Sequence, residues 1–103
     1  MLTINNKQYK EKPIDFNATI EMQELGGDLY QVASKPLAVL RAYFAYCAGL
    51  DATTAGEEIS AHIVGGGDLA DLSEALNRAM EESDFFKAMV AKATAEENSA
   101  KAK

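Results

Sequence analysis

The chain has 103 residues, 48% hydrophobic and 25% charged, which is the composition of one soluble globular domain. Its formal net charge of −6 comes entirely from residues 51–103, which hold five basic and eleven acidic side chains. This balance argues against nucleic-acid binding, which needs a basic surface, and the single cysteine, Cys47, excludes an internal disulfide. We expect Cys47 to be a buried apolar residue in a reducing compartment. Residues 1–10 lack the apolar core of a secretion signal, so we expect a cytoplasmic protein.

The first expected element is a two-stranded β-hairpin, formed by Leu2–Asn5 and Gln8–Glu11. Asparagine tolerates positive φ, so we expect Asn6 and Lys7 to form the tight turn between the strands. An isolated hairpin is only marginally stable. Its apolar side chains should therefore pack on the helices that follow.

A first helix is expected over residues 18–25, with Asp15 or Asn17 as its N-cap. The glycine pair that follows should end this helix, because glycine is favoured just past a helix C-terminus. Residues 28–33 are compatible with either a helical turn or a loop.

The stretch Pro36–Leu50 predicts a central helix. From Leu37 onward only Arg41 and Gly49 fall outside the apolar set, so the helix is apolar nearly all the way round. Such a helix is enclosed by neighbouring elements or by another chain. A membrane span needs about 20 apolar residues, more than this stretch provides, so we expect no membrane association. Ser34 should cap this helix, which should end at Gly49.

Three more helices are expected in the second half of the chain. Thr54–Glu57 matches a capping box that opens a helix to about residue 64. After a flexible run of three glycines, Asp68 should cap a helix whose apolar positions follow a helical period over residues 69–80. Ser83 or Asp84 should cap the last helix.

These elements predict a mainly α (α+β) fold. An N-terminal two-stranded β-hairpin packs on a bundle of four to five short helices around the central apolar helix. We expect a single domain over residues 1–93 and a flexible charged tail over residues 94–103, which contains only Ala, Thr, Glu, Asn, Ser and Lys.

Catalytic chemistry has little basis in the sequence. His62 is the only histidine, and a catalytic triad or a zinc site needs more ligands than one histidine and one distant cysteine. A helix-surface or half-buried structural role for His62 is the favoured interpretation. The glycine run lacks the Lys-Ser or Lys-Thr of a phosphate-binding loop, so a hinge is expected there. Asp68 and Asp71 are explained by helix capping rather than by a metal site. We therefore predict no enzyme activity, no metal and no cofactor.

Apolar side chains on two helices are the strongest functional signal. The central helix carries more apolar residues than one small core can accept, and the last helix adds two phenylalanines and a methionine. Ordinary core packing is the alternative interpretation for each side chain. The candidate partner-binding or self-association residues are Leu37, Leu40, Tyr43, Phe44, Phe85, Phe86 and Met89.

The order of these segments resembles a known family. The opening LTINNKQY of Leu2–Tyr9 is similar to the I-x-I-N-G-K-x-Y hairpin of tail assembly chaperones from long-tailed (siphovirus-type) bacteriophages or prophages. Asn6 stands where that family usually has glycine, and asparagine also tolerates positive φ. The similarity covers about residues 2–90. Its later segments are Glu24–Leu29, Tyr46–Leu50, Glu57–Ile59, Leu69–Met80 and Ser83–Phe86.

The resemblance implies a non-enzymatic assembly factor in the cytoplasm of the bacterial host that is not part of the mature virion. Such proteins bind the tape measure protein, keep it soluble, recruit tail tube subunits and self-associate into homo-oligomers. Many also exist as a longer frameshifted form. Here residues 96–103 lack the Lys-Lys pair that often marks the slip site. The alternative is a small phage-encoded adaptor or inhibitor that binds a host protein through its acidic half.

Overall fold

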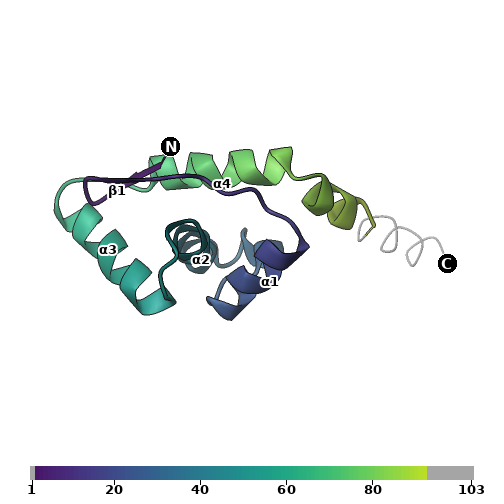
Figure 1. Cartoon of the computed structure of the whole chain (residues 1–103), viewed down its shortest axis with the longest axis horizontal. Helices are drawn as coiled ribbons and strands as arrows, with labels where there is room; N and C mark the ends of the chain where they lie inside the picture. Colours follow the sequence, from purple (N-terminus) through teal and green to yellow (C-terminus); the bar gives the residue numbers. More distant parts are fainter. Residues whose placement is uncertain (1, 93–103) are drawn as a thin grey trace.

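The computed structural model describes residues 2–92, which are mainly helical (Figure 1). This confirms the expected fold class of a helical bundle with an N-terminal antiparallel hairpin. Residues 84–92 are also helical and follow α4, projecting at the end of the molecule opposite to α3. Residues 93–103, including the expected charged tail, lie outside the described part. The elements are β1 (Leu2–Ile4), β2 (Lys7–Tyr9), α1 (Phe16–Glu24), the 3₁₀ turn η1 (Leu29–Gln31), α2 (Pro36–Ala48), α3 (Ala52–Val64) and α4 (Ala70–Glu82).

The hairpin turn differs from the prediction by one residue. Asn5 and Asn6 occupy the turn with φ values of 54° and 65°, and Ile4 pairs with Lys7 across it. A two-residue turn of this kind requires positive φ at both central positions, which asparagine adopts more readily than lysine. The second strand therefore begins at Lys7 and ends at Tyr9, earlier than expected.

Helix α2 lies in the middle of the molecule and contacts α1, α3 and α4 (Figure 1). Seven of its residues are buried. Pro36 occupies the first turn as expected, but Ser34 does not cap the helix and instead donates a hydrogen bond to the carbonyl of Gln31. Gly49 ends α2 with a left-handed φ of 71°, which confirms the expected stop.

Aspartate side chains open two of the other helices. Asp15 accepts a hydrogen bond from the backbone N–H of Ala18 at 2.8 Å, which decides between the two caps considered for α1. Asp51 caps α3 by accepting from Thr54, so the expected capping box at residues 54–57 is wrong and the helix begins earlier. The stronger signal was the aspartate just before the helix, because a carboxylate there both caps and favours the helix dipole.

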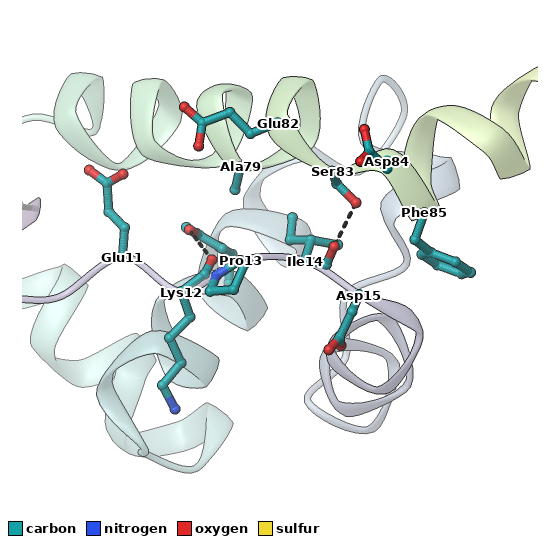
Figure 2. Close-up of a pocket in the computed structure, with 11 residues that line it drawn as sticks. Glu11, Lys12, Pro13, Ile14, Asp15, Ala79, Glu82, Ser83, Asp84 and Phe85 are labelled. Carbon is teal, nitrogen blue, oxygen red and sulfur yellow. Dashed lines mark hydrogen bonds between the residues drawn. The ribbon is translucent and has the colours of Figure 1, made fainter.

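The extended segment between the hairpin and α1 is held by hydroxyl groups. The backbone carbonyls of residues 12–14 each accept one hydrogen bond from a side-chain hydroxyl. Tyr43 donates to the first at 3.0 Å, Tyr46 to the second at 3.1 Å and Ser83 to the third at 2.5 Å. Figure 2 shows the bond from Ser83. Helices α2 and α4 are thereby tied to the same short segment, which satisfies three carbonyls that have no strand partner.

The structure corrects the expected exposure of Leu40, Tyr43 and Phe44. All three are buried in the core. The ring of Tyr9 on β2 meets the ring of Phe44 edge-on, with centroids 5.0 Å apart. The hairpin and α4 cover the apolar face of α2 that we expected to remain exposed for a partner. The apolar residues of α2 therefore lie largely in the core, and among the large apolar side chains of this helix only Leu37 is well exposed.

We predict that Phe44→Ala lowers the free energy of unfolding by about 3–5 kcal/mol, because it leaves a cavity at the centre of the core. Leu37→Ala is the matched control on the same helix. Since Leu37 is 68% exposed, its truncation should change stability by less than about 0.5 kcal/mol. Urea unfolding followed by circular dichroism measures both. Equal losses in the two variants would contradict the burial of Phe44.

We also predict that Ser83→Ala destabilises the chain by about 1–3 kcal/mol, because the buried carbonyl of Ile14 loses its donor. The same hydroxyl accepts from the N–H of Phe86, so the helical segment over residues 84–92 loses its cap as well. Asp84→Ala changes an exposed neighbour and is the control. An unfolding midpoint that is unchanged in Ser83→Ala would refute this role.

Candidate interaction surfaces

The structure separates the seven predicted partner-binding residues into three groups. Leu40, Tyr43 and Phe44 belong to the core. Leu37 stands in the first turn of α2 and is exposed. The other three candidates lie together on the helical residues 84–92, where the two phenylalanines are half-buried and the methionine is 39% exposed. The contact roles of these four accessible residues stay predictions.

An exposed cluster of aromatic and aliphatic side chains forms where α1, η1 and residues 84–92 meet. The ring of Phe16 meets Phe85 edge-on at 5.7 Å between centroids, and Tyr30 stacks on Phe86 at 6.1 Å. Phe16 is 59% exposed and Tyr30 is 47% exposed. We call this the aromatic surface, and its members are Phe16, Tyr30, Phe85, Phe86, Met89 and Val90.

Sequence reasoning did not identify Phe16 and Tyr30 as part of a site. Phe16 precedes the helix expected over residues 18–25, and Tyr30 lies in residues 28–33, which are compatible with either a helical turn or a loop. Only the tertiary arrangement brings each of the two rings against the last helix. For Tyr30, the available signal was an aromatic residue in a short segment that follows two glycines.

A shallow apolar pocket of about 430 Å³ adjoins the aromatic surface. It lies between the end of α4 and the helical segment that follows. Apolar and aromatic linings of this kind accept an apolar side chain from a partner. Its lining residues are Met80, Glu81, Phe86, Lys87, Val90 and Ala91.

A second apolar depression of about 380 Å³ runs between α2 and α3. We call it the α2–α3 groove. Leu37 on one wall is 68% exposed and Ile63 on the other is 48% exposed. The groove also contains Arg41, the only charged residue of α2. Its lining residues are Leu37, Ala38, Leu40, Arg41, Gly56, Ile59, Ile63 and Leu69.

A third pocket of about 400 Å³ lies between the segment 11–15 and the end of α4 (Figure 2). Four carboxylates line it, from Glu11, Asp15, Glu82 and Asp84. Arg78 forms an ion pair with the first of these and holds its pKa below the ordinary range, mainly through the hydrogen bond. Within residues 2–92 no group of three or more acidic, histidine or cysteine side chains is arranged to hold a metal ion.

His62 has a structural position in the fold. Its Nδ1 accepts a hydrogen bond from the backbone N–H of Asn5 at 2.9 Å, so the ring proton is on Nε2, which donates to the carbonyl of Asp68 at 2.9 Å. The imidazole thus links the hairpin turn to the loop between α3 and α4. A Cβ at Gly67 would stand 2.4 Å from this ring, so the glycine run gives room to the histidine. The half-buried structural role for His62 is confirmed.

Cys47 is also part of the core. Burial raises the pKa of its thiol, and a thiol that stays protonated is a poor nucleophile. Burial likewise raises the pKa of Tyr43, whose hydroxyl remains a hydrogen-bond donor to the segment before α1. Both groups are consistent with a packing role.

No helix in the described part of the chain is long and apolar enough to cross a membrane. Comparison of the sequence with protein families and curated proteins, and of the structure with solved structures, finds no match. The surfaces described above are therefore the basis for any functional proposal.

The hairpin turn predicts a pH dependence of stability. The side chain of Glu58 accepts from Asn5 at 2.9 Å and pairs with Lys7 at 3.4 Å, and the Asn5 bond is the larger cause of its lowered pKa. A carboxyl whose pKa is lower when folded adds stability above its unfolded pKa and loses it as pH falls through the folded value.

We therefore expect the unfolding midpoint to fall as the pH is lowered below the ordinary glutamate value of 4.5. Glu58→Gln should flatten part of this acid dependence, because the amide does not titrate. Glu57→Gln changes the exposed neighbouring residue and serves as the control. An identical acid dependence in both variants would show that Glu58 makes no contribution.

Proposed function

We propose that this chain is a tail assembly chaperone of long-tailed bacteriophages. In this role it binds the tape measure protein, keeps that long helical client soluble and recruits tail tube subunits in the cytoplasm of the bacterial host. It self-associates while doing so and does not remain in the mature virion. The proposal needs no catalytic residue and no cofactor.

Exposed apolar side chains are the observation that supports this proposal most. Single exposed apolar residues are ordinary, but clustered ones mark interaction sites. Two such clusters lie on the described part of the chain, the aromatic surface and the α2–α3 groove. The large exposed hydrophobic residues are Phe16, Ile20, Tyr30, Leu37, Ile63, Val64, Met89 and Val90.

The chemistry of the aromatic surface suits an amphipathic helical client. Phe85 and Phe86 are partly supported by rings from α1 and η1, so they are held in place while their outer faces stay accessible. Met89 adds an adaptable side chain one turn further along the helix. A helical client presents apolar residues at intervals of three and four, which is the pattern that such a surface can accept. The order of sequence motifs along residues 2–90 supports the same assignment.

Co-expression with the tape measure protein of the same phage tests the proposal. We expect the client to move into the soluble fraction and to co-purify with this chain. The double variant Met89→Asp, Val90→Asp removes apolar contacts worth about 2 kcal/mol, which should weaken the complex by roughly thirtyfold. Ala88→Asp introduces a charge at an exposed position of the same helix and serves as the control.

A tape measure protein that stays insoluble and unbound would refute the chaperone assignment. Capture of a host protein with no tail protein would favour the adaptor or inhibitor instead. Circular dichroism of each variant separates loss of binding from loss of folding, since neither altered side chain belongs to the core.

A further inference from the structure

Arg41 is an unusual residue within α2. It is half-buried, and its Nε atom is shielded from solvent and has no hydrogen-bond partner among the described residues. Neither does the rest of its guanidinium form a hydrogen bond or ion pair in that part of the chain. Arginine carries five N–H donors, and buried polar groups in native structures are nearly always paired. The side chain is thus placed for an acceptor that the described chain does not supply.

The fold leaves space around this guanidinium. A Cβ at Gly26 would stand 3.1 Å from Nη2 of Arg41, and a Cβ at Gly56 would stand 3.5 Å from its Cδ. The first distance is tight, so glycine at position 26 gives the guanidinium room beside the end of α1, whereas the second is an ordinary contact distance and shows only that α3 borders the side chain. The same side chain lines the α2–α3 groove, where it is the only charged lining residue among residues 2–92.

The shape and lining of the groove limit what can occupy it. Aliphatic side chains spaced along two packed helices, such as Ile59 and Ile63 at an interval of four, match the ridge of a third helix. A single cation among them favours one carboxylate, because guanidinium binds a carboxylate through two parallel hydrogen bonds.

We propose that the α2–α3 groove binds an amphipathic helix of another protein whose apolar face carries one Asp or Glu, and that this carboxylate pairs with Arg41. Leu37 and Ile63 contact the apolar residues on either side of it. This groove assignment deepens the proposed function, and it rests on the proposed function only for the statement that the client is helical. Arg41 sets the register of the bound helix, since one buried charge pair fits one alignment.

A second copy of this chain is the rival occupant. Its exposed helical segment over residues 84–92 carries apolar residues, but no carboxylate lies among them after Asp84. This segment therefore lacks the acidic residue that Arg41 requires, so charge complementarity disfavours it as the occupant of the groove.

A displayed library of amphipathic helices tests the inference. The peptides have about 18 residues, or about 27 Å of helix, with leucines on one face and one position of that face randomised. Selection against the full chain should enrich Asp and Glu at the randomised position by at least about tenfold over Gln and Asn. Selection against Arg41→Gln should lose this preference, and Arg41→Lys should keep part of it. Lys10→Gln, an exposed lysine that does not line the groove, is the matched control.

Failure to enrich acidic residues, or equal enrichment with Arg41→Gln, would overturn the inference. So would selected peptides that still bind Leu37→Asp, because they would occupy another surface.

Light scattering of the chain and of Leu37→Asp tests the rival occupant. A mass that falls only in the variant would assign the groove to a second copy. Co-expression of the tape measure protein with Arg41→Gln separates the two proposals. A client that stays soluble and bound with Arg41→Gln removes the groove assignment alone. A client that stays insoluble with the unaltered chain, while the peptides still select for an acidic residue, removes the chaperone assignment alone.

Discussion

Enclosure of α2 is the constraint on which the rest of the structure depends. The helix supplies seven buried residues, and α1, α3 and α4 all contact it. Two of its tyrosines also bind the segment that crosses from the hairpin to α1. One apolar helix therefore provides the centre of the core and fixes the path of the chain before α1. A helix that is apolar on every side must be enclosed, because a long face left in water would lose the apolar burial that stabilises the fold.

Because α2 is used for the core, several of the accessible apolar residues lie near the ends of elements. Phe16 opens α1, Leu37 stands in the first turn of α2, and Ile63 is near the end of α3. Side chains at such positions make few core contacts. Their chemistry can change with the partner while the free energy of folding stays nearly constant, which suits a protein whose role is to bind another protein.

The two proposed contact surfaces differ in what they contribute. The aromatic surface offers large, adaptable apolar area but no charge among its members, so it favours affinity over alignment. The α2–α3 groove holds one arginine without an internal partner, and a charge pair of that kind contributes specificity. In our proposal a helical client uses the first surface for contact area and the second for register.

The sequence by itself determined most of the elements and their order, because caps, turns and apolar periods act within about one helical turn. Asp15, Gly49 and Ser83 marked helix boundaries that the structure confirms. The exposure of the aromatic residues was decided only by the tertiary structure. Tyr43 and Phe44 look surplus on a helix that is apolar all round, until the hairpin and α4 cover them. Phe16 and Tyr30 look unremarkable until their rings meet the last helix. Local sequence signals cannot tell which face of such a helix is buried, because the burial of each face depends on the elements that pack against it.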